Sequence, residues 1–279
     1  MAIPELKNAL GLLSRMPVLW IPGIVCGLCA AALWLVLNFS GTFFAGRLLI
    51  VSGLIVLLFI TGMLWNTKNE SGNIRTMIEG GIRYYFRVLL PILVIVFTVM
   101  LVFILIFITL TLAGVTPDPG LMAAVSIVIM IPSIILSFFC DIAAVFEDRG
   151  VFDAIRRSIE LVGTRLQEVI AFLAICAVIT AGVLFSLMIL WEAVLYDRLE
   201  PLTHYTEAQI QAFTPDQLVA IIGPDGTWIT ALVLFIACLI LVPVLFTFKA
   251  CFFKSLAQKE APVQQATGEF DSKGRWYKY

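Results

Sequence analysis

The chain has 279 residues, of which 61% are hydrophobic and only 13% are charged. Soluble domains are about half apolar and about a quarter charged, so this chain has too few polar side chains to cover a surface that faces water. The composition excludes a soluble enzyme, a disordered protein and a collagen-like chain. The net charge of −1 excludes a strongly basic nucleic-acid binder. A multi-pass membrane protein remains.

In chain order, the first segment is amphipathic with interspersed acids and bases, so we expect no cleavable signal peptide. Six apolar runs follow, each long enough to cross a hydrocarbon core of about 30 Å as a helix. They lie near 17–37, 45–65, 88–113, 121–146, 167–191 and 228–252. The runs are continuously apolar rather than alternating, which favours helices over strands. We predict an all-α membrane protein with a single six-helix transmembrane domain over 1–255 and a polar cytoplasmic tail over 256–279.

A segment with apolar residues three and four apart precedes each odd-numbered run. In the third copy these residues repeat the first at an offset of 149, whereas the second copy is looser and has Arg75 at one apolar position. We predict three repeat units, near 1–68, 69–146 and 147–255. Each consists of an amphipathic helix lying in the membrane interface and a transmembrane hairpin.

The basic residues are strongly one-sided under this topology. Sixteen of the eighteen Lys and Arg residues fall on the side of both termini, and only Arg47 and Arg198 fall on the other. By the positive-inside rule, both termini are predicted to be cytoplasmic in a cell (plasma) membrane. Candidate contacts to anionic headgroups or a cytoplasmic protein partner are Arg15, Arg83, Arg87, Arg156, Arg157 and Arg165. A purely structural role as connectors beneath the bundle stays open for these segments.

The outer loop over 192–227 is predicted to carry two short helices, over 206–213 and 215–222. It holds the one histidine, His204, but a second histidine at metal-binding spacing is missing. All six cysteines lie in apolar runs, and Cys26-Gly-Leu-Cys29 is interpreted as packing rather than as a redox or metal motif. P-loop, nucleophile-elbow, zinc-protease and dinucleotide motifs are absent from the sequence. We expect no cofactor, no metal and no enzyme activity.

One stretch, from Asp141 to Val162, reads DIAAVFEDRGVFDAIRRSIELV. An apolar helix ends in Val145-Phe-Glu147, Gly150 follows, and then Ala154-x-x-Arg157-Ser158-x-x-Leu161-Val162. This stretch resembles a superfamily of membrane domains that includes the membrane domain of glycerophosphoryl diester phosphodiesterases and several uncharacterised bacterial and archaeal families. The resemblance implies a membrane module of unknown function. Phosphodiesterase activity belongs there to a separate soluble domain, and we do not expect it here.

Two ionisable residues lie within apolar runs, where a charge costs about 2.5–3.5 kcal/mol at the centre of a helix. Asp141 lies about 9 Å inside the cytoplasmic end of its helix, and Lys249 lies at a similar depth in the sixth helix, so they could pair. A structural pair, snorkelling to the interface and a proton or solute relay all stay open. Pro132 and Pro243 are predicted to kink the fourth and sixth helices.

The sequence therefore favours a non-enzymatic scaffold or accessory membrane subunit, with the lipid bilayer and a cytoplasmic or membrane protein as partners. The alternative is a transporter or lipid-handling permease with a path near Asp141 and Lys249. A dry, well-packed interior would favour the first function and a water-filled cavity the second.

Overall fold

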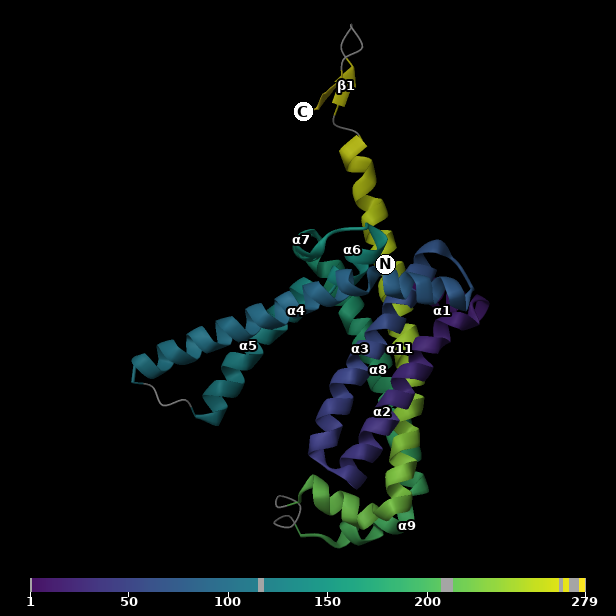
Figure 1. The fold of residues 1–279 in the computed structure, drawn as a ribbon, viewed down its shortest axis with the longest axis vertical. Coiled ribbons are helices and arrows are strands. Elements are labelled where there is room, and N and C mark those ends of the chain that lie inside the picture. Colours follow the sequence, from purple (N-terminus) through teal and green to yellow (C-terminus); the bar gives the residue numbers. More distant parts are fainter. Residues whose placement is uncertain (1, 115–117, 207–212, 266–267, 271–275, 279) are drawn as a thin grey trace. The chain divides into compact units, whose positions relative to one another are not determined.

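The computed structural model describes residues 2–114, 118–206, 213–265, 268–270 and 276–278 (Figure 1). These residues are overwhelmingly helical, as expected for a backbone that must satisfy its own hydrogen bonds in lipid. The elements are α1 (Ala2–Arg15), η1 (Pro17–Trp20), α2 (Ile21–Ser40), α3 (Thr42–Asn69), α4 (Ile74–Leu112), α5 (Pro119–Ser137), α6 (Cys140–Phe146), α7 (Val151–Thr164), α8 (Leu166–Val194), α9 (Tyr196–Leu199), η2 (Glu200–His204), α11 (Pro215–Gln265), β1 (Gly268–Phe270) and β2 (Trp276–Lys278).

Six helical segments in the described part of the chain are long and apolar enough to cross a membrane. They are Pro17–Ser40, Thr42–Asn69, Ile74–Leu112, Pro119–Phe146, Leu166–Val194 and Gln217–Gln258. The prediction of a helical chain with six long apolar helices is therefore confirmed. The short strands β1 and β2 pair antiparallel within the tail, with Phe270 opposite Trp276.

Three element boundaries differ from the prediction. The second amphipathic segment and the third apolar run form one continuous helix, α4, because no glycine or proline separates them between Arg83 and Leu90. The fourth run is divided at Phe138 and Phe139, whereas α5 stays helical through Pro132. α11 likewise stays helical through Pro243 and has a non-helical backbone at Gly223 (φ 67°).

The predicted helix over 215–222 is present as the start of α11, which continues beyond Gly223. The predicted helix over 206–213 lies mostly outside the described residues. The chain divides into two compact units, each assembled from separate segments. Unit 1 contains Met1–Leu10, Arg83–Phe172 and Phe248–Tyr279, and unit 2 contains Gly11–Ile82 and Leu173–Thr247.

Unit 2 is held together by close contacts between helices at glycines. A Cβ atom at Gly23 would lie 2.7 Å from the Leu239 carbonyl oxygen, and one at Gly27 would lie 2.7 Å from the Phe235 carbonyl oxygen. Glycines allow the backbones of membrane helices to approach each other closely. The α2–α3 turn is made at Gly41, whose φ of 85° favours glycine. An apolar core lies beside these contacts, formed by Leu13, Met16, Leu19, Met63 and Val244.

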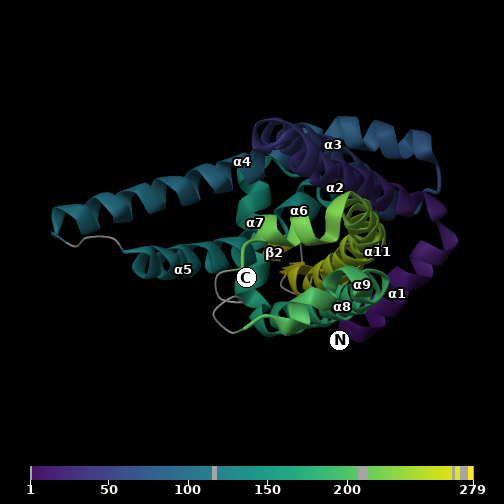
Figure 2. The same ribbon diagram turned by 90° about the horizontal axis from the view of Figure 1, so that it is seen from below.

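Unit 1 contains α7, the third predicted amphipathic segment. Its buried residues are Ala154, Ser158, Leu161 and Val162. Phe152, at 75% exposed, and Ile159 both lie on its surface, so much of the apolar stripe faces away from the protein core. The hairpin of α4 and α5 also belongs to this unit from Arg83 onward (Figures 1 and 2). Most of its large apolar side chains are exposed.

Candidate functional site

The strongest polar contact inside an apolar span lies in unit 1, between α6 and α11. The Nζ atom of Lys249 donates to both carboxylate oxygens of Asp141 at 2.8 Å. The two residues are 8% and 9% exposed. The Ile142 amide also donates to Asp141, at 2.9 Å. Of the alternatives that the sequence left open, the structure has the ion pair.

Aromatic rings surround this pair. The Lys249 Nζ atom lies 4.4 Å from the centre of the Phe138 ring, which adds a cation–π contact. Adjacent rings form a continuous cluster in which Phe172 packs against Phe248 at 4.6 Å and against Phe252 at 4.5 Å between ring centres. Phe139 joins the same cluster and is fully buried. The low polarity of these rings strengthens the attraction between the two charges and raises the cost of separating them.

The break between α5 and α6 brings Asp141 into this position. Leaving the helix at Phe138 and Phe139 frees backbone groups that must find partners when buried. Ser158 of α7 supplies both partners: its Oγ atom donates to the Leu136 carbonyl at 2.7 Å and accepts from the Phe139 amide at 3.0 Å. One buried hydroxyl therefore connects α7 to the broken fourth span.

The turn after α6 makes a second set of polar contacts. Glu147 accepts from Arg149 and also from Arg157, the latter at 3.0 Å. Asp148 has a left-handed backbone (φ 54°) and accepts from Arg87. Hydrogen bonding from Tyr84, together with the nearby positive charge of Arg87, holds the pKa of Asp148 below its ordinary value.

The residues of the stretch from Asp141 to Val162 thus mainly form structural contacts. Asp141, Glu147, Arg157 and Ser158 each bind another part of unit 1. The spacing of charges allowed the Asp141–Lys249 contact to be suggested in advance. The roles of Ser158 and Asp148 were missed, although both lie in the quoted stretch, because a helix break and a left-handed turn leave no periodic signal.

Most of the cations expected to contact headgroups or a partner have acidic neighbours in the structure. Arg87 pairs with Asp148, Arg157 with Glu147, Arg156 with Glu160 at 2.7 Å, and Arg165 with Glu168 at 3.3 Å. Hydrogen bonding to Arg156 holds the pKa of Glu160 below its ordinary value. Arg83 stacks 5.5 Å from the centre of the Tyr84 ring, and Arg15 is exposed at the end of α1. A headgroup or partner role for these residues stays a prediction.

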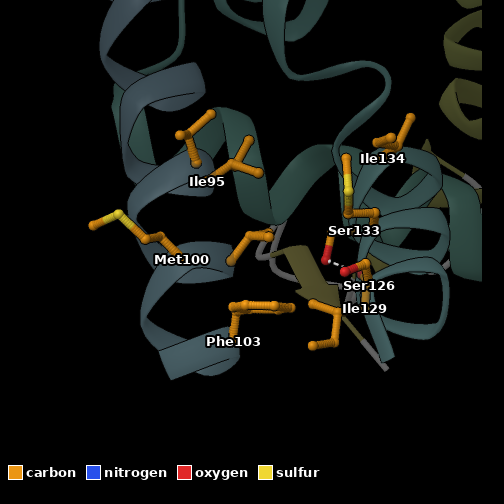
Figure 3. A pocket seen from close by; sticks show the side chains of 10 residues that line it. Ile95, Met100, Phe103, Ser126, Ile129, Ser133 and Ile134 are labelled. Atoms are coloured by element: carbon orange, nitrogen blue, oxygen red, sulfur yellow. Dashed lines mark hydrogen bonds between the residues drawn. The ribbon is translucent and has the colours of Figure 1, made fainter. Parts of the chain in front are cut away.

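An apolar groove lies between α4 and α5 (Figure 3). Its cavity volume is about 470 Å³, and a neighbouring pocket of about 210 Å³ shares Ile95, Val99 and Ser133 with it and reaches Ile155 and Ile159 of α7. The groove's two serines donate to the backbone of their own helix: Ser126 to Met122 and Ser133 to Ile129. Their hydroxyls are thus already satisfied, and the groove presents an apolar surface.

The predicted outer loop lines a third pocket, of about 410 Å³, in unit 2. Trp191, Tyr196, Glu192 and Glu200 are among its lining residues, whereas the exposed His204 is not. Within the described ranges, His, Cys, Asp and Glu side chains form no group of three or more that could hold a metal ion.

These features describe a chain built like a multi-pass helical membrane protein, with six apolar helices of spanning length. The chain belongs to the family described as a domain of unknown function (DUF7847), whose model matches residues 1–256. The matched region includes the Asp141–Lys249 pair and the α4–α5 groove. No curated protein and no solved structure matches the chain.

Proposed function

We propose that this protein is a non-enzymatic scaffold or accessory subunit of the plasma membrane, with both termini cytoplasmic. The observation that carries the proposal is the closed Asp141–Lys249 pair. A carboxylate that accepts from an ammonium group 2.8 Å away, among phenylalanine rings, offers no free ligand or base to a solute. Burying a charge in hydrocarbon costs free energy, and here the two buried charges stabilise the contact between α6 and α11.

The proposal includes the finer architecture of three hairpins, each preceded by an amphipathic segment at the cytoplasmic interface. The sidedness of Lys and Arg supports it, as does the exposure of Phe152 and Ile159 on α7. The resemblance of residues 141–162 to the membrane domain of glycerophosphoryl diester phosphodiesterases agrees with a non-catalytic module, because catalysis there belongs to a separate soluble domain.

The groove between α4 and α5 is the proposed docking surface, and its occupant is an apolar transmembrane helix of a partner protein. Small residues let membrane helices approach, as Gly23 and Gly27 do in unit 2. Ser126 and Ser133 stand seven residues apart, and therefore on one face of α5, where they leave room for incoming side chains. Their hydroxyls are satisfied internally, so an apolar partner would leave no buried polar atom unpaired.

The test is purification of the tagged full-length protein from native membranes in mild detergent. A membrane partner should co-purify in stoichiometric amount, and Ser133→Phe should remove it by filling the groove. Ser186→Phe is the matched control, because Ser186 also donates to the backbone one turn earlier, at Gly182, but lies on α8. Purification of the chain alone, or equal loss in both variants, would overturn the proposed docking surface.

A permease is the second candidate, favoured by the position of Asp141 and Lys249 inside two apolar spans. Its test is proton flux into proteoliposomes, followed with a pH-sensitive dye under an imposed membrane potential. A scaffold should give the same flux as protein-free vesicles. A flux that depends on the protein and disappears in Asp141→Asn, with the amount of folded protein unchanged, would establish the permease instead.

A further inference from the structure

Two cysteines far apart in the sequence meet inside unit 2. Cys26 lies on α2 and Cys238 on α11, and their side chains are near enough to each other to interact electrostatically. Cys29, one turn further along α2, interacts electrostatically with Cys26. α2 and α11 lie side by side in both ribbon views (Figures 1 and 2).

The two thiols lie where the helices approach most closely. Three contacts between α2 and α11 follow one antiparallel register. They join Gly23 to Leu239, Gly27 to Phe235, and the Trp34 indole to the Thr227 carbonyl. Cys26 lies three residues after Gly23, and Cys238 three residues after Phe235, so each is one turn from a residue of this contact and near the same face of its helix. Both cysteines therefore flank the contact and are partly buried.

This close approach matters for the chemistry that the thiols can undergo. Helix axes ordinarily lie 8–10 Å apart, whereas a disulfide needs Cα atoms about 4.4–6.8 Å apart. At Gly23 and Gly27 an added Cβ would meet backbone oxygen at 2.7 Å, so the two backbones are in near contact. The glycines thus allow a closer approach than the ordinary helix separation, as a disulfide between the two helices requires.

We propose that Cys26 and Cys238 form a dithiol–disulfide couple within the membrane, and that its oxidant is a lipid-soluble quinone. Both S–H bonds break and one S–S bond forms. The two protons and two electrons pass to the quinone, which becomes a quinol with two new O–H bonds. The oxidised form joins the first and sixth spans covalently.

The depth of the site determines the class of oxidant. Cys26 is nine residues from the start of its span at Pro17, so it lies roughly 13 Å into a core about 30 Å thick. A soluble disulfide such as glutathione would have to enter hydrocarbon to reach it. Quinones partition into the bilayer, which makes them the matching two-electron acceptor.

The experiment uses the full-length protein in lipid nanodiscs, with decylubiquinone as the oxidant. After denaturation, maleimide-reactive thiols are counted by intact mass, and linked peptides are mapped without reduction. The number of reactive thiols should fall from the six of the sequence by two, and the linked peptides should contain Cys26 and Cys238. Copper phenanthroline serves as a second oxidant that does not depend on quinone.

Single variants distinguish a Cys26–Cys238 link from one that involves Cys29. Cys29→Ser should still lose two thiols on oxidation, whereas Cys238→Ser should lose none. An unchanged thiol count in the wild-type protein with both oxidants, or a link between Cys26 and Cys29, would overturn the couple. Oxidation by copper phenanthroline alone would overturn the quinone assignment. The wild-type peptide map stays decisive even if a variant folds poorly, and the inference does not depend on the proposed docking surface.

Discussion

At the scale of single residues, the chain uses its few intramembrane charges and hydroxyls as structural contacts. The depths of Asp141 and Lys249 followed from counting residues to the ends of their apolar runs, so their pairing could be suggested from the sequence. The role of Ser158 could not, because it depends on a helix break nineteen residues earlier, at Phe139. Periodicity identifies faces of regular helices but carries no information on where a helix is interrupted.

The Asp141–Lys249 pair should be far more sensitive to loss of one partner than to loss of both. Asp141→Asn leaves the ammonium group buried without its counter-ion, and we expect it to lower the free energy of unfolding by about 3–5 kcal/mol. The double variant Asp141→Leu/Lys249→Met should recover most of that loss, because apolar side chains of similar size replace buried pairs well. Equilibrium unfolding in mixed micelles measures the free energy of unfolding of both variants.

Arg156→Ala is the control for this pair. It removes a surface ion pair with Glu160 and should change the free energy of unfolding far less than Asp141→Asn does, because solvent screens exposed charges. Additive losses in the double variant, or a single variant as mild as the control, would contradict the prediction.

Asp148 should make stability dependent on acid pH. Its folded-state pKa lies below the ordinary 3.8, so the unfolded chain takes up the proton first. The contribution of its contacts with Tyr84 and Arg87 should be complete above about pH 5 and should disappear as pH falls through the lowered pKa. Asp148→Asn should therefore be less stable than wild type at pH 7, and the two unfolding midpoints should converge as pH falls through the lowered pKa.

Asparagine is the right replacement because it also tolerates the left-handed backbone of Asp148. Any difference at pH 7 then reports the charge rather than backbone strain. A gap between the midpoints that is the same at pH 2 and pH 7 would show that the carboxylate charge contributes nothing.

At the scale of elements, long apolar runs were predictable because a spanning helix needs about 20 apolar residues and little else. The boundaries of the elements were less predictable. The fourth span is interrupted at Phe138 and Phe139, where Ser158 of another helix satisfies the freed backbone, and the sequence did not indicate this position. The kink expected at Pro132, within α5, stays a prediction. The second amphipathic segment and the third apolar run are one continuous helix, α4, which also contains Pro91, so the sequence did not reveal that they are joined.

The contact between α2 and α11 should depend on its glycines. Gly27→Leu would force a side chain against the Phe235 backbone, and we expect a loss of about 1–3 kcal/mol in the free energy of unfolding. Gly53→Leu on α3 is the matched control, because an added Cβ there meets nothing within 4 Å. It should be neutral or slightly stabilising, since glycine weakens a helix interior. Equal losses in both variants would show that the close approach contributes nothing to stability.

At the scale of the whole molecule, sequence and structure contribute different information. The structure supplies six helices of spanning length, whereas the side of the membrane on which each end lies follows from the distribution of Lys and Arg. Hydrocarbon does not discriminate between the two orientations, but the positive-inside rule does. Three of the apolar helices lie between Gly72 and His204, so full crossings would put the two positions on opposite sides, and the Lys and Arg distribution predicts that Gly72 is on the cytoplasmic side.

This topology is testable with single cysteines in a cysteine-free background, since both positions are exposed and an added Cβ at Gly72 meets nothing within 4 Å. His204→Cys should react with a membrane-impermeant maleimide in intact cells, and Gly72→Cys only after permeabilisation. The reverse pattern would invert every span and place the sixteen basic residues outside. Labelling of both in intact cells would contradict the six crossings, because three spans between Gly72 and His204 must place them on opposite sides of the membrane.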